Sequence, residues 1–121
     1  MPTAWLLLLL ALGEGRLAHR ETIASLVTSR HTHVEVEGHV TVVRHEADGD
    51  WHVRLSDGHR FIVAEIIPTL VPPEGPILPP KPGDCVRIRG IRRVDTEAGH
   101  GWIEVHPVEF LEVIPCNAWH P

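Results

Sequence analysis

The sequence has no surplus of positive charge. Its 121 residues include 11 lysines and arginines against 16 aspartates and glutamates, which gives a formal net charge of −5 with histidine neutral. Proteins whose affinity comes mainly from nucleic-acid backbones usually carry a basic surplus, because neutralising phosphates supplies most of that affinity. The composition therefore argues against tight DNA or RNA binding by the whole surface, but it leaves room for a local basic strip.

The sequence also lacks a hydrophobic run long enough to cross a bilayer. The uncharged run Trp5–Leu12 is much shorter than the about 20 residues that a spanning helix needs. Small residues at Ala11 and Gly13 suit a cleavage site, so we predict an export signal over residues 1–13 and a periplasmic or extracellular location. No lysine or arginine precedes the run, which leaves a buried N-terminal helix as the alternative.

Cysteine is scarce, with two residues in the chain. They form no Cys-x-x-Cys spacing, so they indicate no cysteine-based zinc site. Cys85 stands at the start of one predicted strand and Cys116 just beyond the end of the next, where an antiparallel pair would make them neighbours. We predict a disulfide, which fits export and would stabilise the fold by about 3–4 kcal/mol through closure of the intervening loop. Two unpaired thiols are the alternative.

Long helices are not expected, because the chain holds 11 prolines and 10 glycines. Hydrophobic residues make up 43% and charged residues 22%, as in one folded domain rather than a disordered chain. Alternating apolar and polar residues, with turn signals between them, predict strands. The predicted strands are Val34–Val42, Trp51–Ser56, Phe61–Ile67, Val86–Ile91 and a last one from Trp102 onward. Seven prolines between Pro68 and Gly83 exclude a helix or a central strand there.

This strand pattern predicts an all-β fold, a five-stranded OB-type Greek-key barrel with a proline-rich crossing in place of the usual helix and a signal-like helix before it. A three-strand meander, a long crossing and a final hairpin follow the OB-fold order. The predicted boundaries are a signal peptide at 1–13, a polar segment at 14–31, the barrel at 32–115 and a tail at 116–121. A β-sandwich is the competing architecture, for which five strands are few.

Alternation also assigns side chains to faces. One face of the first strand carries four valines, Val34, Val36, Val40 and Val42. Gly38 interrupts this strand, where a bulge or sharp coil would let one strand serve two sheet faces. In the second strand, His52 and Arg54 lie on the face opposite to the apolar residues.

The binding surface of an OB barrel is the outer face of its second and third strands, flanked by the first and last hairpin loops. On this plan the outward residues of three strands meet in one groove that is rich in carboxylates and imidazoles. The candidate ligand-binding residues are His52, Arg54, Glu65, Trp102, Glu104 and His106. No catalytic residue is assigned, and a non-enzymatic binding domain is favoured.

Three interpretations of this groove stay open: solvated surface groups, a binding module, or a site for a divalent metal such as zinc or manganese. In a module Trp102 would stack on a single-stranded nucleic acid, an oligosaccharide or a peptide, with nucleic acid the default by fold analogy. The arginines that would supply a basic strip for it are Arg87, Arg89, Arg92 and Arg93. The loop candidates for metal binding are Asp48, Asp50 and His100.

The stretch Val42–Asp50, followed by an alternating strand and a hairpin, resembles the opening of thermonuclease-like OB domains. The resemblance implies calcium binding at Asp50. That family has an arginine early in its third strand, whereas Phe61–Pro68 contains no arginine and has Glu65 as its one acid. Without an arginine to stabilise a pentacoordinate phosphate, nuclease catalysis is not expected. A degenerate nuclease-like or metal-binding OB domain is the alternative to a binding module.

The chain is also similar to small exported bacterial OB-fold proteins of uncharacterised function. The residues that carry this resemblance are Asp48–His52, Asp57 and His100–Val108. It covers most of the chain after the signal segment, and it implies an OB barrel outside the cytoplasm without implying any activity.

Overall fold

The computed structural model describes residues 17–96 and 101–121; the predicted signal peptide at 1–13 and His100 lie outside the described residues. The strands are β1 (His19–Glu21), β2 (His33–His45), β3 (Trp51–Ser56), β4 (Phe61–Ile66), β5 (Cys85–Val94) and β6 (Ile103–Ile114). The helical segments are α2 (Ile23–Leu26) and the 3-10 turn η1 (Cys116–Ala118). The described chain is all-β with few helices, as predicted. None of its helices has the length and hydrophobicity that a membrane crossing requires.

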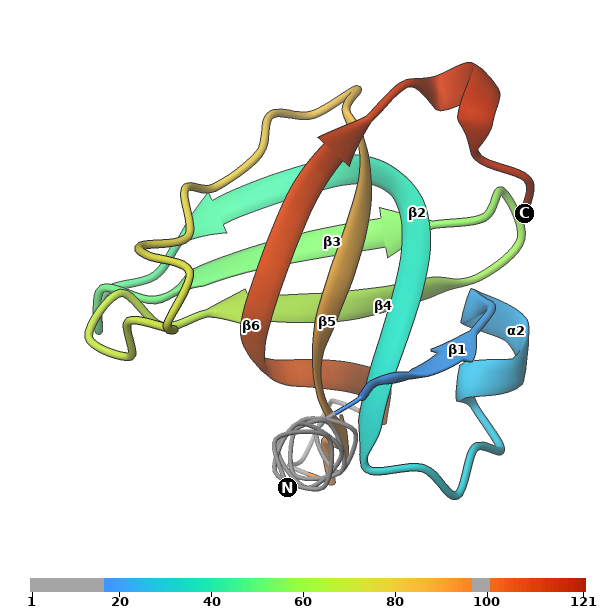
Figure 1. Cartoon of the computed structure of the whole chain (residues 1–121), viewed down its shortest axis with the longest axis horizontal. Helices are drawn as coiled ribbons and strands as arrows, with labels where there is room; N and C mark the ends of the chain where they lie inside the picture. Colours follow the sequence, from blue (N-terminus) through green and yellow to red (C-terminus); the bar gives the residue numbers. More distant parts are fainter. Residues whose placement is uncertain (1–16, 97–100) are drawn as a thin grey trace, which may run out of the picture.

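Strands β2 to β6 close into a five-stranded barrel, to which β1 adds an extra strand (Figure 1). Strands β2, β3 and β4 form an antiparallel meander, β6 pairs with β4 in parallel, and β5 lies between β6 and β2. The prediction of a closed five-stranded barrel is confirmed, and the strand order is consistent with an OB-like fold. This order also places β6 beside β4, so that outward side chains of these two strands can meet.

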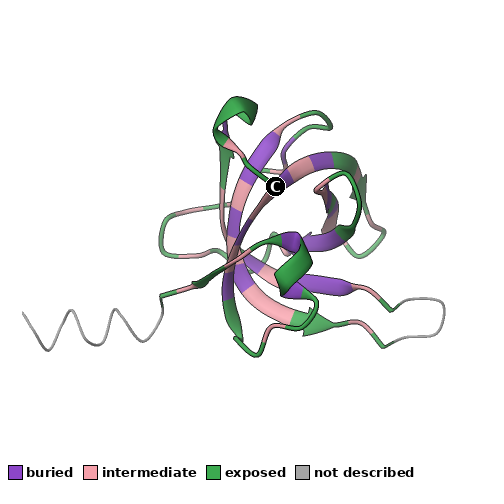
Figure 2. Cartoon of the chain, turned by 90° about the vertical axis from the view of Figure 1, so that its right-hand side faces the viewer, coloured by how far each residue is buried: buried purple, intermediate pink, exposed green. Residues whose placement is uncertain are grey.

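Apolar side chains fill the inside of the barrel, and the buried segments follow the strands in Figure 2. The interior residues that are fully buried include Val34, Val36, Val40, Val53, Leu55, Ile62, Ala64, Val86, Ile88 and Val105. Branched aliphatic residues fit this environment because they pack well on a pleated surface. The interior is therefore a packed core, and any ligand has to be held by the outer wall or the loops.

Helix α2 covers one end of this core. Thr22 caps its first turn: the Thr22 hydroxyl accepts a hydrogen bond from the Ser25 amide at 3.0 Å, and the Ser25 hydroxyl accepts one from the Thr22 amide at 2.9 Å. This reciprocal capping fixes so short a helix in place. Its apolar residues Ile23 and Leu26 are both buried against the core.

The first long strand, β2, departs from the predicted face assignment. Its pairing with β3 shifts register between Val40 and Val42. The shift reverses the alternation, so Val42 is exposed and Val43 packs against the core instead. The prediction that Val42 shares the inner face with the earlier valines is wrong, because an extra residue in a strand exchanges its two faces. Gly38 lies two residues before the shift and is itself buried beside Leu55 and Ile23.

Residues 67–84, between β4 and β5, contain turns and extended chain and no helix or strand. Their last residues continue the ladder of β2. The Val40 amide donates to the Asp84 carbonyl at 2.8 Å, and the Gly83 amide donates to the Val40 carbonyl at 2.8 Å. The Asp84 carboxylate also accepts a hydrogen bond from the Lys81 amide at 2.9 Å. The segment is thus anchored at the point where β5 begins.

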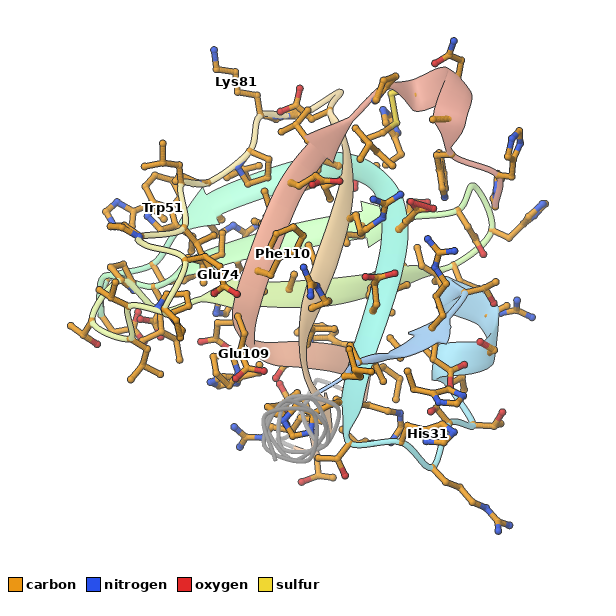
Figure 3. The ribbon with its side chains drawn as sticks, in the orientation of Figure 1. His31, Trp51, Glu74, Lys81, Glu109 and Phe110 are labelled. Carbon is orange, nitrogen blue, oxygen red and sulfur yellow. A yellow bond between two sulfur atoms is a disulfide. The ribbon has the colours of Figure 1, made fainter. Side chains whose placement is uncertain are left out.

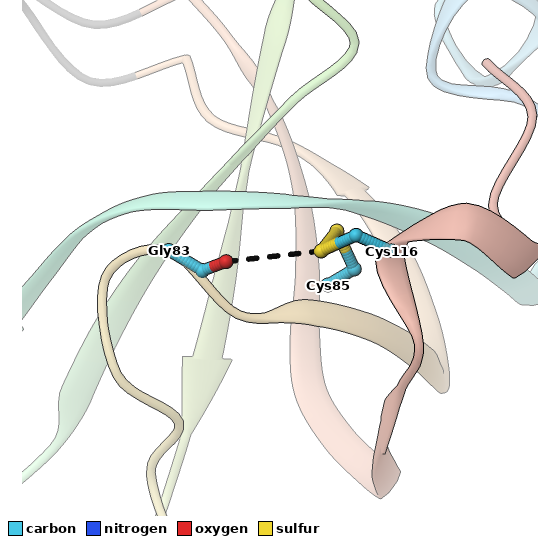
Figure 4. Close-up of a disulfide and its surroundings, with 3 residues drawn as sticks. All are labelled: Gly83, Cys85 and Cys116. Carbon is cyan, nitrogen blue, oxygen red and sulfur yellow. Dashed lines mark hydrogen bonds between the residues drawn. A yellow bond between two sulfur atoms is a disulfide. The ribbon is translucent and has the colours of Figure 1, made fainter.

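The predicted disulfide between Cys85 and Cys116 is confirmed. It joins the first residue of β5 to the residue that begins η1, just past the end of β6 (Figure 4). Cys85 is buried, and the Cys116 sulfur lies 3.8 Å from the Gly83 carbonyl oxygen. Because Cys85 pairs with Ile114 in the β5–β6 ladder, the bond locks the open end of this hairpin.

The β3–β4 turn depends on one carboxylate. Asp57 Oδ1 accepts hydrogen bonds from the amides of His59 at 2.8 Å and Arg60 at 2.7 Å. The amide of Arg60, and then that of His59, hold the pKa of Asp57 below its ordinary value of 3.8. We expect Asp57→Ala to lower the free energy of unfolding by about 1 kcal/mol near neutral pH, measured by urea denaturation.

The pH dependence of this effect has a definite sign. A carboxylate whose pKa is lower in the folded state stabilises the fold above its unfolded pKa, and this contribution is lost as the pH falls through the folded pKa. The gap between wild type and Asp57→Ala should therefore narrow in acid. Asp57→Asn keeps an acceptor oxygen and is the matched control, which should cost less near neutral pH; its gap to wild type should also narrow in acid, since it too lacks the ionisable carboxyl. An equal gap at all pH values would show that the turn does not use the ionised carboxylate.

Candidate functional site

The outer wall of β3, β4 and β6 brings together two carboxylates and two imidazoles. His52 on β3 pairs directly across from Glu65 on β4. In the parallel ladder Val63 pairs with Glu104 and Ala64 with Val105, which sets Glu65 level with His106 on β6. All four residues follow the outward parity of their strands, because their neighbours Val53, Ala64 and Val105 point into the core. We call His52, Glu65, Glu104 and His106 the acid–imidazole cluster.

The distances within the acid–imidazole cluster are those of direct contact. His106 Nδ1 lies 2.8 Å from Glu65 Oε2 and 3.6 Å from Glu104 Oε1. His52 Nε2 lies 3.2 Å from the other Glu65 oxygen, Oε1. Although they are on the outer wall, Glu65 and Glu104 are only 7% and 5% exposed. Two acids that are this buried are uncommon on the outside of a small barrel and require compensating partners.

The surrounding residues orient this cluster. Trp102 Nε1 donates a hydrogen bond to Glu104 Oε2 at 3.1 Å. Glu46, in the β2–β3 turn, places Oε1 3.4 Å from His52 Nδ1. Arg93 on β5 brings a guanidinium nitrogen to 3.3 Å from His106 Nδ1. The cluster is therefore held from β5, from the turn before β3 and from the residue before β6.

Burial decides the ionisation of Glu65. Desolvation raises the pKa of the Glu65 carboxyl, and the nearby His106 and His52 offset part of this rise. A hydrogen bond with the Asp50 side chain raises the pKa further. Glu65 therefore gains a proton more readily than an exposed glutamate does, unless a positive charge is placed beside it.

Next to the acid–imidazole cluster lies an aromatic and cationic surface. The guanidinium carbon of Arg54 is 4.1 Å from the centre of the Phe61 ring, and the Phe61 and Trp102 ring centres are 6.1 Å apart. Phe61 is 39% exposed, although it begins a strand that is otherwise buried. A shallow hollow of about 60 Å³ lies beside it, lined by Val42, Arg44, His52, Arg54, Val63 and Trp102. We call Phe61, Trp102 and Arg54 the aromatic platform.

All the predicted ligand-binding residues lie on this one face of the barrel. Of the loop candidates for metal binding, Asp48 and Asp50 are described, and their carboxylates have different partners. Asp48 Oδ1 accepts a hydrogen bond from the Asp50 amide at 3.0 Å, which is a turn-forming role. Asp50 reaches Glu65 rather than Asp48 with its side chain, and His100 lies outside the described residues.

The predicted basic strip on β5 is largely engaged elsewhere. Arg87 forms ion pairs with Glu37 at 2.9 Å and Glu112 at 2.8 Å. Arg92 donates to the carbonyls of Leu26 at 2.7 Å and Val27 at 2.8 Å, where α2 ends. The Arg89 guanidinium lies 3.9 Å from the Phe110 ring centre, on the side of β6 that faces the viewer in Figure 3. Of the strip as predicted, Arg93 is the member that reaches the acid–imidazole cluster.

Sequence reasoning missed Phe61 as a residue of this face. Phe61 shares its parity with Val63 and Glu65, which was a sufficient signal for its outward position.

Comparisons with known proteins identify a fold and no family. No protein-family model and no curated protein sequence matches the chain. Among solved structures, the fold is similar to that of a protein assigned as an aspartyl-tRNA synthetase from Leishmania major Friedlin, with a TM-score of 0.60 at 15% sequence identity. The match covers 79% of this chain and 20% of that protein, so this chain corresponds to about a fifth of its length.

Proposed function

We propose that the protein is an OB-type binding module that holds a single-stranded nucleic acid on the outer wall of β3, β4 and β6. The aromatic platform is the observation that carries this proposal. The rings of Phe61 and Trp102, with Arg54 over Phe61, form a surface on which bases can stack. Stacking of this kind tolerates any base sequence, because every base has a π-face.

The position of the platform agrees with the binding mode of OB barrels. Arg54 and Phe61 lie on the strands that correspond to the second and third strands of an OB fold, and Trp102 lies in the last hairpin loop, directly before β6. On this view residues 67–84 take the place of the helix between the third and fourth strands. The solved structure of similar fold is named as an enzyme that acts on tRNA, which is consistent with the ligand class.

The exposed ring of Phe61 favours a single strand over a duplex. Arg44 and Arg54 line the hollow beside Phe61 and can contact phosphates, whereas the neighbouring acid–imidazole cluster carries the carboxylates of Glu65 and Glu104. A few phosphate contacts give weak, strongly salt-dependent binding. Stacking supplies the remaining affinity, and stacking requires unpaired bases.

The compartment belongs to the same proposal. A disulfide persists in oxidising environments outside the cytoplasm, and the segment 1–13 has the composition of an export signal. The module would thus meet its ligand in the periplasm or outside the cell.

Replacing Phe61 with alanine tests the platform. We expect Phe61→Ala to weaken binding of a labelled single-stranded oligonucleotide about 5- to 100-fold, because a stacked base is worth about 1–3 kcal/mol. The measurement is a fluorescence anisotropy titration of the full chain at low and at physiological salt. The melting temperature should change little, since Phe61 is partly exposed.

Phe110 offers a matched control. It is also a phenylalanine beneath an arginine, with the Arg89 guanidinium carbon 3.9 Å from its ring centre, but it lies over β5 and β6 and away from the platform (Figure 3). Phe110→Ala should leave the affinity unchanged. Equal losses in both variants would overturn the platform as the binding surface. Absence of binding at low salt would overturn nucleic acid as the ligand class and turn the search to oligosaccharides and peptides.

A further inference from the structure

We propose that Glu65, Glu104 and His106 bind a divalent transition-metal ion such as Zn²⁺ or Mn²⁺. Each residue offers one ligand atom, and these three atoms all lie within 4.8 Å of one another. One imidazole and two carboxylates form a mixed nitrogen–oxygen ligand set. Such a set suits Zn²⁺ or Mn²⁺ better than it suits Ca²⁺ or Mg²⁺, which prefer all-oxygen sites. The site goes beyond the proposed nucleic-acid binding and does not depend on it.

The backbone places these ligands before any ion arrives. Glu65 and His106 stand level on the paired strands β4 and β6, and Glu104 lies two residues from His106 on the same face. Side chains on paired strands are held more precisely than side chains on loops, so little ordering is needed when a metal binds. On β6 a three-residue alternation places two ligands on the same outer face: Glu104 and His106 flank Val105, which points into the core.

One oxygen of each carboxylate is anchored, and the other is turned toward His106 Nδ1. Trp102 Nε1 holds Glu104 Oε2, which leaves Oε1 3.6 Å from Nδ1. His52 holds Glu65 Oε1, which leaves Oε2 2.8 Å from Nδ1. Partners that orient the ligating groups in this way are the usual second layer around a protein-bound metal. The three atoms that converge are therefore those that an ion would use.

The charge of the cluster also points to a cation. The Glu65 and Glu104 side chains are only 9% and 6% exposed, so two carboxylates share one poorly hydrated place. A divalent ion would neutralise both charges, with His106 as a neutral ligand and further positions open to water. Arg93, whose guanidinium nitrogen is 3.3 Å from His106 Nδ1, competes with the ion for this position.

A second group of ligand types lies elsewhere and supplies an internal control. It consists of His19, Glu21 and His31, near the start of the described chain. Its histidines are exposed with their rings stacked 3.4 Å apart, and the Glu21 carboxylate already accepts hydrogen bonds from the Ser25 and Ser29 hydroxyls. This group is hydrated and already satisfied, so we expect it to contribute less to metal binding.

The test is a calorimetric titration of the full chain, without a histidine tag, with Zn²⁺ and with Mn²⁺. We expect one equivalent to bind, and Glu65→Gln and Glu104→Gln to weaken the affinity by at least about tenfold. Glu21→Gln is the matched control and should keep the wild-type affinity. Phe61→Ala should also keep it, so failure of the metal site and failure of the nucleic-acid platform can be told apart.

Arg93→Met provides a variant that does not remove a ligand. Because Arg93 is exposed and repels a cation from His106, its replacement should strengthen metal binding while the fold is kept. A purely structural cluster would not show this gain. The proposal would be overturned if the wild-type protein took up neither ion. It would also be overturned if Glu65→Gln bound the metal as tightly as wild type, or if Glu21→Gln lost binding instead.

Discussion

Removal of the Cys85–Cys116 bond is expected to lower the free energy of unfolding by about 3–4 kcal/mol. The bond closes a loop over a sequence separation of 31 residues, and this loop contains both β5 and β6. Without the bond the unfolded chain gains conformational entropy, while the folded chain loses only a constraint. Urea denaturation of the Cys85→Ala, Cys116→Ala double variant measures the effect, which should also lower the melting temperature by more than about 10 °C.

Chemical reduction distinguishes the stability that comes from the covalent bond from the stability that comes from the packing of its two sulfur atoms. Cys85 is buried, so its replacement also removes contacts in the core. Wild-type protein in a reductant keeps both sulfur atoms and should lose most of the same stability, whereas the double variant should not respond to the reductant. A reduced wild type as stable as the oxidised one would show that the loop is constrained by strand pairing alone.

Gly90→Ala is expected to destabilise the protein by about 3 kcal/mol or to prevent folding. Gly90 lies on β5 between two shifts in the register of β5 with β6, and its backbone approaches Pro107 of β6 closely. A methyl group there would fall onto the Pro107 carbonyl oxygen and within 2.7 Å of Val105 Cγ1. A backbone oxygen in a sheet cannot move aside as a flexible side chain can, so the two strands would have to separate. The unfolding free energy in urea measures the loss.

Gly38→Ala is the matched control for this prediction, because it also adds a methyl group to a buried strand glycine. Its nearest neighbours would be the end of the Ile23 side chain at 3.0 Å and Leu55 Cβ at 3.1 Å. The Ile23 tip can shift by a few tenths of an ångström, so the cost should be clearly smaller than at Gly90. Tolerance of alanine at Gly90 would mean that β5 and β6 do not approach as closely as described.

The strands could be predicted because their alternation is local. Strand β3 follows the predicted parity throughout, with Val53 and Leu55 inside and His52 and Arg54 outside. The position of the register shift in β2 could not be predicted, because a bulge is set by the hydrogen bonds with the partner strand and not by the residues of one strand. Strand β1 was missed for a similar reason: a short polar segment has no period of its own and becomes a strand only through its pairing with β2.

The sequence could predict which face of the barrel carries the site, but not the burial and the contacts of the residues within it. Outward parity and the OB strand order together place His52, Glu65, Glu104 and His106 on one wall. The burial of the two glutamates could not be foreseen, because it depends on how the neighbouring side chains cover them. The hydrogen-bond partners of the β5 arginines could not be predicted either, because they are distant in sequence. Arg92, for example, donates to a carbonyl of α2, more than sixty residues earlier in the chain.

The extra strand β1 has a consequence for self-association. It pairs with β2 from Val34 to Val36, along a stretch that β3, which pairs from His39 onward, does not reach. An uncovered stretch of this kind exposes unpaired amides and carbonyls, to which a strand of a neighbouring molecule can add and begin polymerisation. Three residues of polar chain therefore protect the side of the barrel where sheet growth would otherwise start.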